Sequence, residues 1–207
     1  MNYLREKLSS NNLKDRVIWS VILFLILFFG IVVISYFIFP EGLLKNKNIL
    51  QSWKSSDNVL ILTLQIFFYN LISVLIIFLA SLFSKKNKGN QNYLSIGYTV
   101  FFTLISINAI VLGTWSFSVE SIAAPLFERI INIFDVVHKS ALWEMLGQLL
   151  ITCSISNISL IKTYKRNVEK RNIREIKLTK QEKIVLLIGI ILMLIGSIIE
   201  SVAINVL

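Results

Sequence analysis

Residues 17–39 read VIWSVILFLILFFGIVVISYFIF, a run of 23 residues without a charged side chain. A helix needs about 20 apolar residues to cross a bilayer, so this run is long enough to do so. Hydrophobic residues make up 55% of the 207-residue chain and charged residues only 16%, which is too apolar for a soluble domain of this size. The sequence therefore predicts an all-α integral membrane protein that forms a single membrane domain. We predict five transmembrane helices, at residues 17–39, 59–83, 94–117, 140–161 and 184–207.

The distribution of basic residues predicts the orientation of these helices. Sixteen of the 21 Lys and Arg residues lie in the N-terminal tail, in the loop after the second span and in the loop after the fourth; five lie on the other side. An excess of basic residues marks the cytoplasmic side, so we expect a multi-pass protein of the cell membrane with its N-terminus in the cytoplasm and its C-terminus outside. A cleaved signal peptide is the alternative for residues 17–39. Its apolar core would be only about 7 to 15 residues long, and no small-x-small site follows Phe39.

Residues 118–138, between the third and fourth spans, have the pattern of an amphipathic helix. Ile122, Leu126 and Ile130 recur at helical spacing, while Glu128 lies on the opposite face. We expect this helix outside the cytoplasm. It could lie flat among the lipid headgroups, dip into the membrane or cap the bundle.

The loop at residues 162–183 carries nine basic and three acidic residues. Anionic headgroups attract such a segment by about 1 kcal/mol per basic residue near the surface, so a bilayer with anionic lipids is the expected counterion and nucleic acid is not. The loop could also serve only to enforce topology, or to bind a cytoplasmic partner. The predicted headgroup-binding residues are Lys162, Lys165, Arg166, Lys170, Arg171, Arg174 and Lys177.

Two carboxylates inside apolar spans, Glu144 and Glu200, are the first functional candidates. A charged residue near the bilayer centre costs roughly 2.5 to 3.5 kcal/mol, so it usually faces a protein interior, a partner or a water-filled path. Given the predicted orientation, both lie in the outer half of the membrane. Each could be a neutral hydrogen-bond donor, a proton or ligand site, or a contact for a partner's transmembrane segment. The predicted set of binding or interhelical polar residues is Asn70, Asn108, His138, Glu144, Gln148 and Glu200.

The last two spans each carry a distinctive face. In the fourth span, Gln148 follows Glu144 by one helical turn, and Thr152 and Ser156 continue the stripe. In the fifth, Gly189, Gly196 and Glu200 fall on one face, and the glycines predict close packing against a neighbouring helix.

Catalysis is not expected. A zinc protease needs two histidines on one helix, and His138 is the only histidine in the chain. A membrane serine protease would have to pair His138 with a serine, and no serine lies in a nucleophile turn. No GxxxxGK[ST] motif occurs, so any nucleotide energy would come from another subunit. We expect no metal and no cofactor, and Cys153 is expected to be a small packing residue.

Four motifs, taken in order, resemble the stage II sporulation protein M family. They are Phe67-Phe-Tyr-Asn-Leu71, Asn108-Ala-Ile-Val-Leu-Gly113, His138 followed by Trp143-Glu-Met-Leu-Gly147, and Ile198-Ile-Glu-Ser201. Ala109 and Lys139 stand where the family has glycine, and the step from His138 to Glu144 is longer by about two residues. By resemblance, the family's motif positions are Asn70, Asn108, Gly113, His138, Glu144 and Glu200.

The resemblance implies a non-catalytic membrane component that works with partners. Some members of the family join a complex that remodels peptidoglycan during engulfment in sporulation, where a peptidoglycan hydrolase is a partner. Others resemble components of loci that export, or give immunity to, circular membrane-active bacteriocins. We expect export or immunity with a membrane-active peptide as the partner. The alternatives are an engulfment scaffold and a transporter subunit energised by a separate ATPase of the ABC type.

Overall fold

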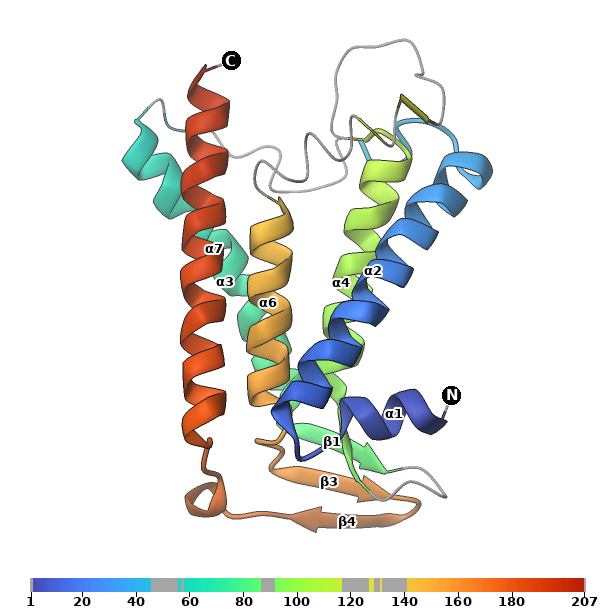
Figure 1. Ribbon diagram of the computed structural model, residues 1–207, viewed down its shortest axis with the longest axis vertical. Helices are drawn as coiled ribbons and strands as arrows, with labels where there is room; N and C mark the ends of the chain where they lie inside the picture. Colours follow the sequence, from blue (N-terminus) through green and yellow to red (C-terminus); the bar gives the residue numbers. More distant parts are fainter. Residues whose placement is uncertain are drawn as a thin grey trace.

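The computed structural model describes residues 2–45, 56, 58–86, 92–116, 127–128, 131 and 141–206. Most of these residues are helical, and four of the helices they form are long and apolar enough to cross a membrane. These helices stand side by side as a bundle (Figure 1). They are α2 (Leu13–Ile38), α3 (Val59–Ser81), α4 (Ile96–Gly113) and α7 (Lys180–Val206).

A shorter apolar helix, α6 (Ala141–Ile155), occupies the middle of the bundle (Figure 1). It contacts all four long helices, and α7 most extensively. Its 15 residues extend about 22 Å, less than the roughly 30 Å thickness of a bilayer core. The predicted span at 140–161 was therefore too long at its C-terminal end, because the helix stops at Ile155 and the chain turns at residues 156–157.

The described residues are mostly helical, as predicted, but four short strands that were not predicted form a sheet across one end of the bundle (Figure 1). The strand order is β2-β1-β3-β4, with β1 and β3 parallel and the outer pairs antiparallel. We call this end of the bundle the sheet end and the other the opposite end. The strands are β1 (Phe83–Lys86), β2 (Leu94–Ser95), β3 (Ile161–Tyr164) and β4 (Asn167–Lys170).

The sheet forms because α3 and α6 run in the same direction and end close together. The Leu82 carbonyl accepts hydrogen bonds from the backbone N–H groups of Leu160 (2.8 Å) and Ile161 (3.0 Å), so the chains leaving the two helices begin to pair at once. Phe83, the last residue of the predicted span at 59–83, therefore belongs to β1, and residues 94–95, the first of the predicted span at 94–117, belong to β2.

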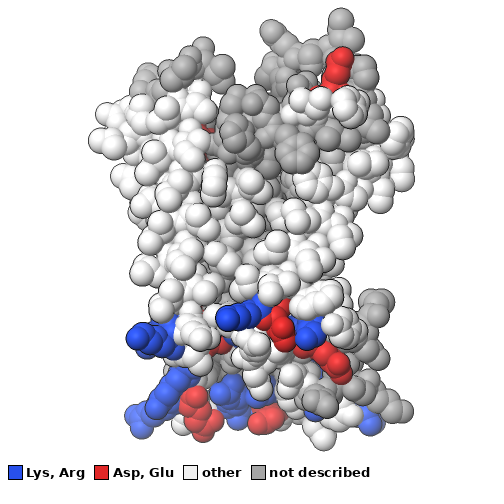
Figure 2. All heavy atoms as spheres, viewed as in Figure 1, with Lys and Arg blue, Asp and Glu red and all other residues white. Residues whose placement is uncertain are grey.

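The basic segment at 162–183 is ordered rather than a simple loop. It contains most of the β3–β4 hairpin, a 3-10 turn (Ile173–Glu175) and the first turn of α7. On the face shown in Figure 2, Lys and Arg gather at the sheet end, and a broad belt free of charged residues covers the middle.

One short helix lies at the sheet end, and one predicted helix falls mostly outside the described residues. A short helix, α1 (Asn2–Leu8), lies at the sheet end, where the Tyr3 ring packs edge-on against Trp19 at 5.2 Å. The predicted amphipathic helix at 118–138 lies outside the described residues, apart from residues 127, 128 and 131, which are helical.

The core between α2 and α4 is aromatic and tightly packed. Phe24 and Phe28 of α2 are buried, as are Phe101 and Ile105 of α4. At the opposite end the two backbones touch, because a Cβ placed on Gly113 would lie 2.5 Å from the Val32 carbonyl oxygen. Gly113 therefore sits where only a glycine allows this approach.

Candidate functional site

Helix α6 carries a polar stripe along its length inside the apolar bundle. Glu144, Gln148 and Thr152 follow one another at intervals of four residues, Ser156 continues the spacing directly after the helix, and all four are buried. The Thr152 hydroxyl donates to the Gln148 carbonyl oxygen at 2.7 Å, so its polar group is satisfied within the helix. Glu144 and Gln148 have longer side chains that reach neighbouring helices.

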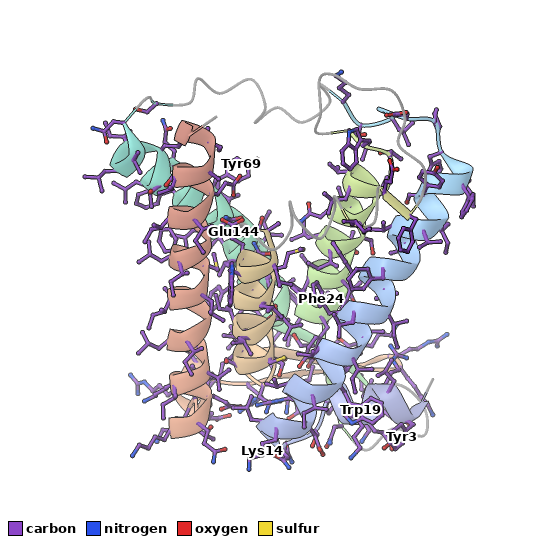
Figure 3. All side chains as sticks on the ribbon, turned by 45° about the horizontal axis from the view of Figure 1, so that its top comes forward. Tyr3, Lys14, Trp19, Phe24, Tyr69 and Glu144 are labelled. Atoms are coloured by element: carbon purple, nitrogen blue, oxygen red, sulfur yellow. The ribbon has the colours of Figure 1, made fainter. Side chains whose placement is uncertain are left out.

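Glu144 interacts with residues of two of the helices that surround α6, α3 and α7, near the opposite end of the bundle. The Ser197 hydroxyl of α7 lies 3.2 Å from Glu144 Oε1 and 2.9 Å from the Met193 carbonyl oxygen, and it can donate to one of them at a time. The Asn70 side chain of α3 also hydrogen-bonds to the Glu144 carboxyl, and Glu200 of α7 is close enough for its like charge to act on Glu144. Figure 3 shows Glu144 below Tyr69 of α3.

Gln148 extends this arrangement by one helical turn. Its Nε2 donates to Asn70 Oδ1 at 3.5 Å, so the Asn70 amide connects two positions of the α6 stripe. We call Asn70, Glu144, Gln148, Ser197 and Glu200 the polar cluster. It joins α3, α6 and α7, and its amides, hydroxyl and carboxyls can accept or donate hydrogen bonds in several arrangements.

Glycines let α6 and α7 approach closely just beside the polar cluster. A Cβ placed on Gly189 would lie 2.8 Å from the Gly147 carbonyl oxygen, and one on Gly147 would lie 2.6 Å from the Gly189 carbonyl oxygen. Gly196 is buried on the same helix as Gly189. This backbone contact positions Glu144 against Ser197, because each lies within about two turns of the touching glycines.

Asn108 was predicted to join the polar set, but the structure places it elsewhere. Its side chain is exposed on α4, because the buried face of that helix carries Phe101, Ile105 and Ala109. His138 lies outside the described residues. The predicted headgroup residues lie at the sheet end, in and beside the β3–β4 hairpin.

The predicted set did not include a buried ion pair at the sheet end. Arg16 of α2 is fully buried, and its Nη2 donates to Glu182 Oε1 of α7. Glu182 Oε2 also accepts from the backbone N–H and the hydroxyl of Thr179, at 2.8 and 3.0 Å. The signal was present in the sequence, because Arg16 shares its helical face with Ser20 and Phe24.

Neither a metal site among the described residues nor a known relative assigns this chain to a functional class. Among the described residues, no group of three or more His, Cys, Asp or Glu side chains is placed to hold a metal ion. Comparisons of the chain with models of known protein families, with curated proteins and with solved structures found no match. The chain is thus defined by its architecture: a helical bundle with four helices of membrane-spanning length among its described residues, a basic sheet end and a buried polar cluster.

Proposed function

We propose that this protein is a non-catalytic component of a multiprotein complex in the cell membrane, and that the polar cluster contacts a membrane-embedded partner. The observation that carries the proposal is Glu144, a buried carboxyl in an apolar bundle with polar neighbours on two other helices. Asn70 and Glu200 are only half-buried, so the polar cluster reaches the surface of the bundle. A partner helix or peptide that offers polar groups would find matching ones there.

The proposal includes the orientation of the chain. The sheet end carries the Lys and Arg residues visible in Figure 2, which supports placing it in the cytoplasm. The N-terminus is then inside and the C-terminus outside, with α6 as a short fifth crossing. The polar cluster accordingly lies in the outer half of the membrane.

The sharper form of the proposal is export of, or immunity to, a membrane-active peptide. Its support is the resemblance of four sequence motifs to the stage II sporulation protein M family, together with the position of the polar cluster. An amphipathic peptide that enters from outside reaches the outer half of the membrane first. Glu144 and Glu200 are acidic groups that suit a cationic or hydrogen-bonding face.

A deletion strain of the host tests this proposal. We expect loss of the gene to change sensitivity to a co-encoded membrane-active peptide, and we expect the wild-type gene and Gly30→Ala to restore it. Gly30 serves as the control because a Cβ at this position meets nothing within 4 Å. Failed spore engulfment with unchanged peptide sensitivity would replace the immunity proposal with the engulfment scaffold. If neither trait changes, both versions are wrong.

A further inference from the structure

Helix α3 crosses the bundle diagonally and leaves a wedge beside α7. At the opposite end α3 touches α7, where the Thr63 and Ser201 hydroxyl oxygens lie 2.6 Å apart. At the sheet end α3 instead packs on α4, where a Cβ placed on Gly97 would lie only 2.0 Å from Ser81 Oγ. The helices α3 and α7 therefore diverge toward the sheet end, with α6 between them (Figure 1).

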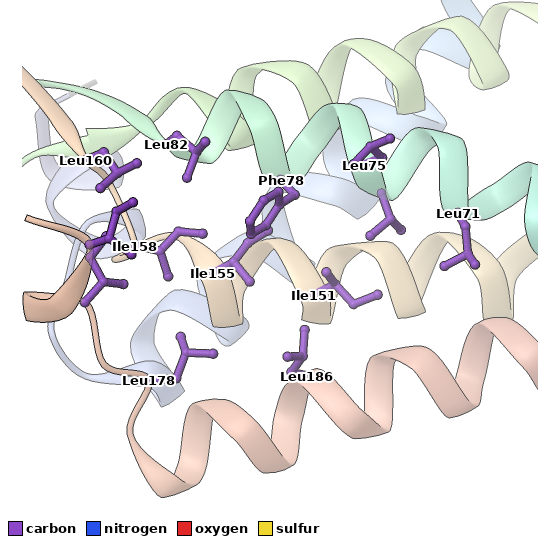
Figure 4. A pocket seen from close by; sticks show the side chains of 13 residues that line it. Leu71, Leu75, Phe78, Leu82, Ile151, Ile155, Ile158, Leu160, Leu178 and Leu186 are labelled. Atoms are coloured by element: carbon purple, nitrogen blue, oxygen red, sulfur yellow. The ribbon is translucent and has the colours of Figure 1, made fainter.

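This wedge is an apolar groove of about 720 Å³. Its volume is within the roughly 300 to 1,000 Å³ of ligand-binding pockets. Ile151 and Ile155 of α6 form the floor, and Leu75 and Phe78 of α3 form one wall (Figure 4). The floor residues are buried, whereas Leu75 is 55% exposed, so the groove opens on the surface that faces lipid.

The sheet end of the groove is lined by apolar residues that alternate with basic ones. Ile173, Ile176 and Leu178 line the groove, and Arg174 and Lys177 stand between them in sequence and are exposed. Residues 171–180 contain four basic residues and one acidic residue, Glu175. An apolar groove that ends under a basic rim matches an amphiphile with an anionic head.

We propose that this groove binds an acyl chain of an anionic phospholipid, whose headgroup lies against Arg174 and Lys177. The lining of the groove extends from Leu71 to Leu160 and Leu178. Beyond Leu71, toward the opposite end, α3 and α7 touch at Thr63 and Ser201 and close the groove. A transmembrane helix of a partner is about 10 Å wide and continues across the membrane, so it does not fit a groove bounded at both ends. A flexible acyl chain does. This lipid site does not depend on the proposed function.

Native mass spectrometry of the purified full-length protein tests the site. The protein is equilibrated in detergent with equal amounts of phosphatidylglycerol and phosphatidylcholine, and the retained lipids are counted. We expect the wild type to retain phosphatidylglycerol in preference. Each basic residue near the surface strengthens the binding of an anionic lipid about fivefold. Replacing both Arg174 and Lys177 with serine should therefore lower the preference for phosphatidylglycerol over phosphatidylcholine roughly 25-fold.

Matched variants separate the site from general charge. Of the basic residues that the sequence predicts to bind headgroups, Lys165 and Arg166 lie at the turn of the β3–β4 hairpin, outside the segment 173–178 that lines the groove. Replacing both with serine removes the same charge and should lower the preference by much less than the rim pair does. Leu75→Trp narrows the groove from its exposed wall and should abolish retention of both lipids. Equal retention of the two lipids by the wild type would overturn the proposal, as would unchanged retention by Leu75→Trp. Formation of a dimer that excludes lipid would identify a second copy as the occupant and also overturn it.

If Leu75→Trp does not fold, the serine variants decide the question alone. All four substituted positions are exposed, so serine at these positions leaves the packing of the bundle unchanged. A preference for phosphatidylglycerol that falls equally in the rim pair and in the hairpin pair would show diffuse charge attraction and contradict a site.

Discussion

Gly189→Ala should destabilise the protein, because it adds a methyl group where two backbones touch. The new Cβ would lie 2.8 Å from the Gly147 carbonyl oxygen and 2.8 Å from Ile151 Cγ1. A carbonyl oxygen of a helix cannot rotate away, so α6 and α7 would have to separate by several tenths of an ångström. Separation also weakens the contact between Glu144 and Ser197, which depends on this approach.

Two opposing effects determine how much Gly189→Ala changes the free energy of unfolding. Replacing glycine with alanine inside a helix stabilises it by about 1 kcal/mol through helix propensity. Overpacking a tight contact costs about 1 to 3 kcal/mol, and this site is at the upper part of that range because the clash is with backbone. The net expectation is a loss of about 1 to 2 kcal/mol. Gly30→Ala on α2 meets nothing within 4 Å, so this control should gain up to about 1 kcal/mol.

Reversible unfolding in mixed micelles, followed by far-ultraviolet circular dichroism, measures both variants. The two free energies of unfolding should differ by about 2 to 3 kcal/mol, with Gly189→Ala the less stable. Equal stabilities, or a gain for Gly189→Ala, would refute the close backbone contact between α6 and α7. The same assay applied to Gly147→Ala should give a loss similar to that of Gly189→Ala, since each glycine faces the other's carbonyl oxygen.

Three further predictions concern other contacts and use the same unfolding assay. Arg16→Met should lower the free energy of unfolding by about 3 to 5 kcal/mol, because it leaves the Glu182 carboxylate buried without its partner. Adding Glu182→Gln should recover much of that loss. No recovery would contradict the pairing of Arg16 with Glu182. A double-mutant cycle of Thr63→Val and Ser201→Ala should give a coupling of about 0.6 kcal/mol, and zero coupling would contradict the hydroxyl contact. Lys165 has a φ of 53°, a left-handed backbone conformation that glycine adopts more readily than lysine does, so Lys165→Gly should raise the free energy of unfolding by about 1 kcal/mol. A lower free energy of unfolding would show that the Lys165 side chain matters more than its backbone conformation.

Apolar length and helical period predicted much of the helical framework. The uncharged run at 17–39 corresponds to α2 and the run at 59–83 to α3, each within a few residues. The spacing of four between Glu144 and Gln148 correctly placed both on one buried face, because a helix has 3.6 residues per turn.

The sheet could not be predicted in this way. Strands β1 and β3 pair in parallel although Phe83 and Ile161, their first partners, are far apart in sequence, and each strand has only four residues. The many basic side chains of residues 162–183 favoured a loop in the sequence analysis, and the hairpin turn at Lys165 has no glycine to mark it.

Helical period also does not say which face of a helix turns inward. Asn108 and Ala109 are neighbours on α4, and it is Ala109 that is buried. Arg16 was counted only as a cytoplasmic charge, because its burial depends on Glu182 arriving from the last helix. Both outcomes depend on how helices distant in sequence pack against one another.

The central claim is that the buried carboxyl position at Glu144 supports assembly with a membrane partner. Blue-native electrophoresis of host membranes tests it directly with the wild type, Glu144→Gln and Glu144→Ala at matched amounts. We predict that the wild type and Glu144→Gln, which keeps the hydrogen-bonding groups, migrate in one complex much larger than the 23.7 kDa chain. We predict that Glu144→Ala remains in the membrane but migrates as the free protein. Identical large complexes from all three proteins would contradict the claim.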